Sequence, residues 1–254
     1  MNLNTKEEGV QKHHSVTIML KFFAGNLTRE QEIGIFWRLA GKAESLVHNN
    51  QEKPYMFYIN PVNTSEGLYE LNVNSIDPNI IEACYESVTA LVKAGEAVDV
   101  QGLKVRPVDA FYVKDLDYIG EKVCLTTETG LCCCKRIRTK TGRRSRYYLD
   151  PRKSSDIEEW KAILARKLSD RTKQFMDIEI PAETINIDIL DVQSREFITY
   201  KSANLPTDRV QVEISAVSPV IFAAIYGGLG SHTGAGFGAV RVSKKKLKRN
   251  EVAA

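Results

Sequence analysis

A glycine-rich segment near the end of the chain constrains the fold more than any other part of the sequence. Six of the twelve residues 227–238 (GGLGSHTGAGFG) are glycine, against sixteen glycines in all 254 residues. Because glycine loses the most backbone freedom on folding, such a run is expected where φ is positive or the backbone closely approaches another group. Exposed N–H groups in such a loop can bind phosphate. A tight hairpin or a helix stop would also account for the glycines.

The flanking segments give the order helix, loop, strand. Ser218-Pro219 predicts an N-cap followed by proline at the first helical position, and residues 220–226 (VIFAAIY) then form a short apolar helix. Residues 237–242 predict a strand. A phosphate-binding P-loop has the reverse order and ends in Gly-Lys-Ser/Thr, which is absent here, so the sequence argues against nucleotide hydrolysis.

A helix followed by G-x-G-x(3)-G-x-G-F-G close to the C-terminus resembles the signature of the RAMP proteins of CRISPR systems. More closely, the chain resembles the endoribonuclease that cuts the long CRISPR transcript into guide RNAs. The resemblance implies two tandem ferredoxin-like domains, metal-independent cleavage without a cofactor, and CRISPR repeat RNA as partner. Other effector subunits and a second copy of the chain are further candidate partners. A non-cleaving RNA-binding subunit of an effector complex is the alternative, and a general binder of single-stranded RNA is a third.

Composition and charge agree with a soluble RNA-binding protein. The chain is 43% hydrophobic and 26% charged, with no apolar run of membrane-spanning length and a polar start, so we expect a cytoplasmic protein away from membranes. Residues 1–120 hold 11 basic and 16 acidic residues, whereas residues 121–254 hold 24 and 16. The basic second half is therefore expected to hold a polyanion.

The pattern of the first half predicts a β-α-β-β-α-β order. Apolar or alternating runs predict strands at 16–22, 55–59, 68–73 and 98–113. Thr28-x-x-Gln31 is a capping box that begins the first helix, and Asp77-Pro78 begins the second, which Gly95 ends. This is the ferredoxin-like order shared with the common RNA-recognition module.

The second half repeats this order loosely. Strands are expected at 122–127, 185–192, 197–201 and 210–217, and a capping box at Ser155-x-x-Glu158 predicts a helix to about residue 175. We therefore expect an α+β fold of two tandem ferredoxin-like (RRM-like, βαββαβ) domains. The expected domains are 15–118, with the candidate catalytic histidine, and 119–243, with the glycine loop; 1–14 and 244–254 are expected to be flexible tails.

His48 and Lys53 are the candidate catalytic residues. The family commonly places a histidine at the end of the first helical region and a lysine soon after, and these two residues match that pattern. Histidine can take a proton from the ribose 2′-hydroxyl or give one to the departing 5′-oxygen, and a cation stabilises the charge on the phosphate. Trp37 occupies the position of the tyrosine that often assists, and it lacks a phenolic proton; Tyr55 or Tyr58 are substitutes. A surface histidine at a helix end is the other interpretation of His48.

Two segments are the candidate RNA-binding surface. Residues 135–153 hold nine Lys or Arg and one acid, with Tyr147 and Tyr148 among them, which suits phosphate contact and base stacking but also a solvated loop. His232 could serve as RNA contact or as a second acid–base group. The candidate RNA-binding residues are Gly228, Gly230, Ser231, His232, Thr233, Gly234, Gly236, Lys135, Arg136, Arg138, Arg143, Arg144 and Arg146.

The five cysteines predict neither disulfides nor a metal site. Three are adjacent, Cys132 to Cys134, which fits neither a disulfide framework nor the usual Cys-x-x-Cys zinc spacing. On a strand, Cys132 and Cys134 would share one face and Cys133 the other, so we expect packing roles.

Overall fold

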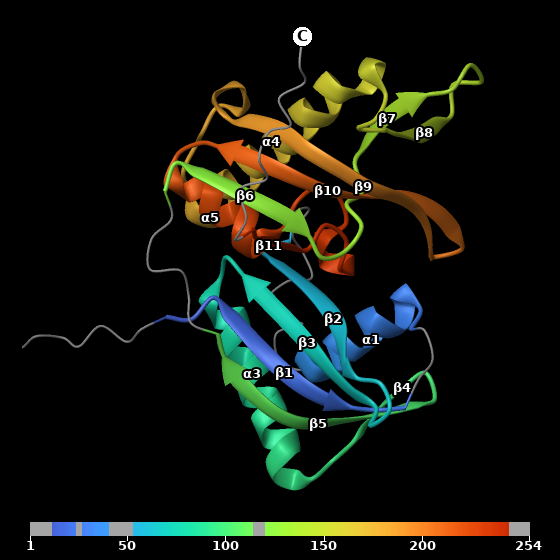
Figure 1. The fold of residues 1–254 in the computed structure, drawn as a ribbon, viewed down its shortest axis with the longest axis vertical. Coiled ribbons are helices and arrows are strands. Elements are labelled where there is room, and N and C mark those ends of the chain that lie inside the picture. The colour runs from blue at the N-terminus through green and yellow to red at the C-terminus, as the bar shows by residue number, and fades with distance from the viewer. Residues whose placement is uncertain (1–11, 24–26, 41–52, 114–119, 244–254) are drawn as a thin grey trace, which may run out of the picture.

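The computed structural model describes residues 12–23, 27–40, 53–113 and 120–243. These residues form two halves, each with a four- or five-stranded antiparallel sheet and helices packed against it (Figure 1). The predicted α+β fold with two ferredoxin-like sheets is confirmed. No helix among these residues is long and apolar enough to span a membrane.

The sheet of the first half has the strand order β2-β3-β1-β5-β4, with every pairing antiparallel. Strands β5, β1, β3 and β2 reproduce the ferredoxin-like arrangement, and the short β4 is a hairpin partner of β5. The elements in chain order are β1 (Ser15–Lys21), α1 (Arg29–Ala40), β2 (Tyr55–Asn63), β3 (Leu68–Ser75), α3 (Pro78–Ala94), β4 (Val98–Val100) and β5 (Leu103–Tyr112).

The helix signals in the first half are confirmed. The Thr28 hydroxyl accepts from the Gln31 N–H at 3.2 Å while the Gln31 side chain accepts from the Thr28 N–H at 3.0 Å, which is a capping box. The Asp77 carboxylate caps α3 through the N–H of Asn79, and Gly95 ends it with φ 66°. Just before β1, the His14 ring packs on Phe222 of the second half, with 4.8 Å between the ring centroids.

The second half has the strand order β11-β6-β10-β9, again ferredoxin-like, with an inserted hairpin of β7 and β8 between the first strand and its helix. This hairpin projects beyond the sheet beside α4 (Figure 1). The elements are β6 (Lys122–Thr127), β7 (Cys134–Arg138), β8 (Arg144–Tyr148), α4 (Ser154–Met176), the 3-10 turn η2 (Ala182–Thr184), β9 (Asn186–Tyr200), β10 (Ala203–Ser215), α5 (Ser218–Gly227), the 3-10 turn η3 (Thr233–Ala235) and β11 (Val240–Val242).

Three local predictions in the second half are wrong. The capping box at Ser155 is absent because α4 begins at Ser154, with Lys153 as its N-cap, and the Ser155 hydroxyl donates to Asp156. Val217, rather than Ser218, is the N-cap of α5, which has no side-chain cap. The three strands expected between 185 and 217 are two long strands, β9 and β10, joined by a tight turn at Lys201-Ser202, where both residues have positive φ.

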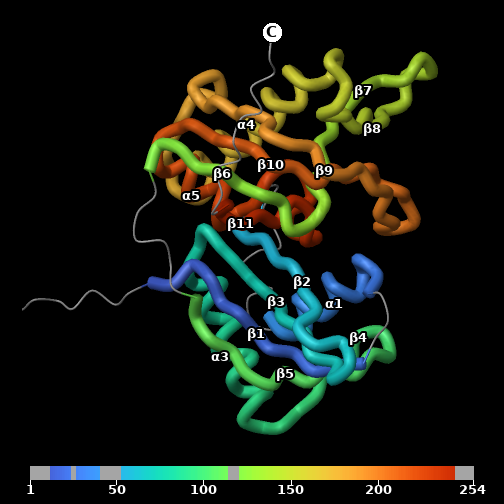
Figure 2. Tube along the Cα trace, viewed as in Figure 1, coloured from blue at the N-terminus to red at the C-terminus, as the bar shows by residue number. Residues whose placement is uncertain are grey.

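The two halves have separate apolar cores that meet at the start of β2. Tyr55 and Phe57 belong to the core of the first half, whereas Met56, which alternates to the other face, belongs to the core of the second. The glycine loop of residues 227–238 lies against this end of β2, as the red and cyan segments of Figure 2 show. The loop therefore forms part of the contact between the halves.

Candidate RNA-binding and cleavage site

The glycine loop folds on itself and on the neighbouring strands. Seven of its N–H groups donate to protein carbonyls: those of Gly228, Leu229, Ser231, Ala235, Gly236, Phe237 and Gly238. Gly228, Gly230 and Gly236 are buried. The expectation that these glycines offer exposed amides to phosphate is therefore wrong, because the loop uses most of its donors to hold its own shape.

Arg171 of α4 binds the glycine loop through hydrogen bonds to its carbonyl groups. Its side chain is fully buried, and its guanidinium donates to the carbonyl oxygens of Gly228 and Gly230 and to the hydroxyl of Thr233. Arginine presents several donors in one fixed plane, so a single side chain can bind three acceptors at once. Its spacing from Leu164 and Leu168 puts Arg171 on the apolar face of α4, but we did not predict its role.

Gly234 leaves no room for a side chain because the loop contacts the first half of the protein at this residue. A Cβ on Gly234 would lie 2.5 Å from Cγ of Lys53 and 3.1 Å from the hydroxyl of Tyr55. The Tyr55 hydroxyl donates to the carbonyl oxygen of Gly234 at 3.4 Å. Lys53 and the loop are thus direct neighbours, although 181 positions separate Lys53 from Gly234 in the sequence.

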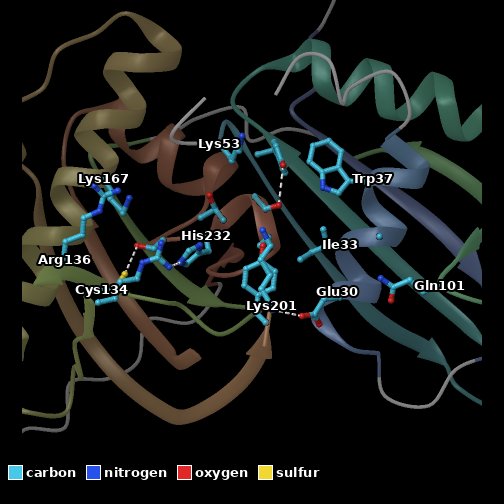
Figure 3. A pocket seen from close by; sticks show the side chains of 18 residues that line it. Glu30, Ile33, Trp37, Lys53, Gln101, Cys134, Arg136, Lys167, Lys201 and His232 are labelled. Carbon is cyan, nitrogen blue, oxygen red and sulfur yellow. Dashed lines mark hydrogen bonds between the residues drawn. The ribbon is translucent and has the colours of Figure 1, made fainter. Parts of the chain in front are cut away.

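A cavity of about 890 Å³ opens between the halves at this contact. One side comes from α1, with Glu30, Ile33, Gly34 and Trp37, and the other from α4, β7, β8 and the loop (Figure 3). Among the described residues, the Lys and Arg side chains that line it are Lys53, Arg136, Arg146, Lys167 and Lys201, against the one carboxylate of Glu30. That carboxylate accepts from the Lys201 N–H at 2.7 Å. The cavity is therefore strongly positive and suited to an anionic chain.

The first half contributes a lysine and aromatic groups to the cavity. Partial burial lowers the pKa of Lys53, because the charged ammonium loses solvation there. Burial raises the pKa of Tyr55 far above its ordinary value, so its phenol stays protonated and serves as a donor to Gly234. Tyr58 faces the core of the second half and does not line the cavity, which removes it as a substitute for the family's tyrosine.

The loop contributes Ser231, His232, Thr233, Gly234 and Ala235 to the cavity lining. His232 lies near the centre of the view in Figure 3, and its Nε2 is 3.3 Å from Nη1 of Arg146. Cys134 faces the Ser231 hydroxyl at 4.0 Å, whereas Cys133 packs in the core of the second half. A hydrogen bond between the Cys132 and Cys134 thiols lowers the pKa of Cys134 and raises that of Cys132. The expected opposite faces for neighbouring cysteines are confirmed.

The basic segment forms the hairpin of β7 and β8, whose two faces differ. Arg136 pairs in register with Arg146, and Arg138 with Arg144, so these four arginines share one face with Tyr148. A second hollow of about 560 Å³ lies along this face and shares Arg136 and Arg146 with the main cavity. The period-two spacing of the arginines around Thr141-Gly142 is a signal for this hairpin that sequence reasoning missed.

The opposite face of the hairpin packs toward α4. Lys135 forms an ion pair with Glu159 and lies over the Tyr147 ring at 5.4 Å. The Tyr147 hydroxyl donates to Asp156 at 3.1 Å. Arg143 lies at the exposed turn, where its N–H donates to the Thr139 hydroxyl. Lys135 and Tyr147 therefore serve the attachment of the hairpin and lie away from the cavity.

The structure brings some of the predicted site residues together and leaves others apart. Lys53, Ser231, His232, Thr233, Gly234, Arg136 and Arg146 line one cavity; Gly228, Gly230, Gly236, Lys135, Arg138, Arg143 and Arg144 do not. His48 lies outside the described residues. Lys167 of α4 lines the cavity and was not predicted. Among the described residues, no group of three or more His, Cys, Asp or Glu is arranged to hold a metal ion.

Comparison with solved structures shows the same fold. The product of a Cas6-related gene from Pyrococcus furiosus superposes with a TM-score of 0.71 at 13% identity, covering 92% of this chain and 100% of that one. A RAMP protein described as binding different RNA substrates gives 0.71 at 15%, covering 91% and 100%. A Cas6 product complex from Thermus thermophilus gives 0.66 at 13%, covering 92% and 100%. At these identities the likeness is one of fold.

The family of this chain is shown by a match of its sequence. No curated protein sequence matches the chain significantly. The family model for the C-terminal part of the CRISPR-associated protein Cas6 matches residues 113–242, which is half of the chain and includes the hairpin, the cavity-lining part of α4 and the glycine loop. The chain belongs to the Cas6 family of CRISPR-associated RAMP proteins.

Proposed function

We propose that this protein is a metal-independent endoribonuclease that cuts CRISPR repeat RNA once per repeat and so releases guide RNAs. The observation that carries the proposal is the basic cavity between the halves, where Lys53 of the first half meets the loop of the second. An RNA strand bound there would have its phosphate neutralised from both sides. Two proteins of similar fold, a RAMP protein that binds different RNA substrates and a Cas6 product complex, support repeat RNA as the ligand.

The reaction is attack of a ribose 2′-hydroxyl on the adjacent phosphate. His48 takes the 2′-proton in this proposal, and Lys53 stabilises the negative charge that develops on the phosphate oxygens. The products are a 2′,3′-cyclic phosphate and a 5′-hydroxyl. The role of His48 rests on the family pattern and on its position five residues before Lys53 in the sequence.

The arginine face of the hairpin extends the binding surface away from the cavity. Alternate residues on a strand are about 6.6 Å apart, close to the spacing of successive phosphates in an RNA strand. Arg136 and Arg146 line the main cavity, and Arg144 continues the same face in the adjoining hollow. We infer that RNA flanking the cut site follows this face.

The test is incubation of the pure protein with repeat RNA in EDTA. We expect one cut per repeat, a downstream fragment whose 5′-hydroxyl accepts phosphate from polynucleotide kinase without prior dephosphorylation, and no cut when the attacking 2′-hydroxyl is replaced by hydrogen. His48→Ala should abolish cutting and retain binding. Cleavage that requires a divalent metal, or that survives the 2′-deoxy substitution, would refute the mechanism.

A non-cleaving RNA-binding subunit is the second candidate. Trp37 lines the cavity where the family often has a tyrosine, and an indole cannot supply a phenolic proton. The same basic cavity would then hold RNA without cutting it. Specific binding of repeat RNA by the wild-type protein, with no cleavage over hours, would favour this function.

A further inference from the structure

His232 has a backbone conformation that disfavours a side chain. Its φ and ψ are 64° and 27°, in the left-handed region, and it is the one non-glycine residue of the glycine loop with positive φ. A glycine would adopt this conformation without strain, whereas a side chain costs about 1–2 kcal/mol. An imidazole is thus held in the cavity at a position where the backbone alone would favour glycine.

The contacts of the His232 side chain orient its Nε2 toward the basic residues of the cavity. Nε2 is 3.3 Å from Nη1 of Arg146, and the centroids of the Tyr200 and Phe237 rings, which contact each other, each lie 6.3 Å from the imidazole in edge-to-face geometry. Because arginine can only donate, Nε2 accepts in this contact and the proton of the neutral ring is on Nδ1. The ring is therefore oriented by its neighbours, with Nε2 toward a cation that itself lines the cavity.

We propose that His232 is the general acid of the cleavage reaction and protonates the departing 5′-oxygen. The inference rests on the proposed endoribonuclease function and adds the proton donor that the cleavage step requires besides its base. A phosphate that binds Arg146 replaces Nε2 as the acceptor, and the imidazole can then bind a proton and present Nε2–H to that phosphate. Lys53, adjacent to Gly234, approaches the same phosphate from the first half.

The step balances in atoms and charge. The 2′-oxygen forms a bond to phosphorus, and its proton passes to the base. The bond from phosphorus to the 5′-oxygen breaks, its electron pair stays on that oxygen, and the oxygen takes the proton from Nε2 of the His232 imidazolium. His232 becomes neutral and regains a proton from water. The other charged groups facing this space are Arg136, Lys167, Lys201 and Glu30, of which Glu30 is held by the Lys201 backbone.

His232→Gly is the decisive variant because glycine is compatible with the loop conformation. We expect it to fold, to bind uncleavable 2′-deoxy repeat RNA within about threefold of wild type, and to cleave about 100-fold or more slowly. His14→Ala is the matched control, because it removes an imidazole that packs on Phe222 outside the cavity. It should cleave at the wild-type rate.

Cleavage of a substrate with sulfur in place of the bridging 5′-oxygen distinguishes a residue that acts as an acid from one that only binds RNA. A thiolate leaves without protonation, so His232→Gly should cleave this RNA within about tenfold of wild type, whereas His48→Ala should remain inactive. Normal cleavage of ordinary RNA by His232→Gly, or a defect that the sulfur substrate does not relieve, would overturn the inference and leave the proposed function intact. A wild-type protein that cuts no repeat RNA would overturn both.

Discussion

Arg171 donates through Nη2 to the carbonyl oxygen of Gly230 over 2.9 Å, from a position with no solvent exposure. It also binds the carbonyl of Gly228 and the hydroxyl of Thr233. The loop that lines the cavity is therefore held by one buried cation. This contact joins α4 to the glycine loop and fixes Thr233, which lines the cavity together with His232 and Lys53.

Replacing Arg171 should destabilise the protein and the loop together. Arg171→Met leaves the carbonyls of Gly228 and Gly230 buried without their donor, at about 1–3 kcal/mol each, so the free energy of unfolding should fall by about 3 kcal/mol. Urea denaturation followed by circular dichroism measures this loss. Arg166→Met, on the exposed side of the same helix, is the control and should stay within about 0.5 kcal/mol of wild type. Equal losses in both variants would contradict the role of Arg171.

Gly234→Ala should displace Lys53 from the cavity. The new Cβ would lie 2.5 Å from Cγ of Lys53, so the lysine or the loop must move. We expect a loss of about 1–3 kcal/mol in stability, as for other overpacked contacts, and at least a tenfold slower cleavage. Gly142→Asn at the exposed hairpin turn has open space around it but a φ of 78°, so it should lose up to about 1 kcal/mol in stability and cleave at the wild-type rate. An unchanged cleavage rate for Gly234→Ala would show that the position of Lys53 is unimportant.

Much of the fold could be predicted because its signals are local. The Thr28–Gln31 capping box, the Asp77-Pro78 start and the Gly95 end each depend on a few adjacent residues, and the structure has all three. Residue alternation placed the strands of the first half for the same reason. The element order then sufficed for the ferredoxin-like fold, since few topologies accommodate βαββαβ.

The site could be predicted only in part because its parts meet through tertiary contacts. The glycines were expected to expose amides, yet what they approach is Met56, Lys53 and Phe57 of the first half. The apolar spacing of α4 puts Arg171 on the same face as Leu164 and Leu168, but nothing in the sequence says that the glycine loop lies against that face. The break expected between two strands at 192–197 was wrong because β9 continues beyond the sheet as a hairpin with β10, where exposed polar residues are tolerated.

Asp208 makes stability depend on pH in a defined direction. It is 1% exposed and 3.5 Å from Arg195, and burial raises its pKa to about 6 despite that cation. The folded state therefore binds more protons than the unfolded state between about pH 4 and pH 6, so stability falls as the pH rises through this window. The Asp208→Asn variant has no titratable group at this position, so its free energy of unfolding lacks this decrease.

Comparison of the two proteins measures the contribution of Asp208. The free energy of unfolding of Asp208→Asn relative to wild type should increase by on the order of 2–3 kcal/mol between pH 4 and pH 7. Taking the difference cancels the opposite trend from Asp150, whose pKa is held low by Arg152 in both proteins. A constant difference across this range would mean that folding leaves the pKa of Asp208 unchanged.

The two faces of the β7–β8 hairpin should differ in their effect on RNA binding. Arg138 and Arg144 lie on the face that continues the cavity wall, whereas Lys135 lies on the other, paired with Glu159. Each arginine that contacts a phosphate releases a counterion, so Arg138→Ala and Arg144→Ala should each weaken binding and reduce the slope of log K against log salt by about one. Lys135→Ala removes the same charge from the same hairpin and should leave that slope unchanged, because its ammonium pairs with Glu159 away from the proposed RNA path. Titrations of 2′-deoxy repeat RNA at several salt concentrations measure both quantities. Equal slopes for all three variants would mean that the hairpin attracts RNA by net charge alone, and the proposed path of the strand along its arginine face would then be wrong.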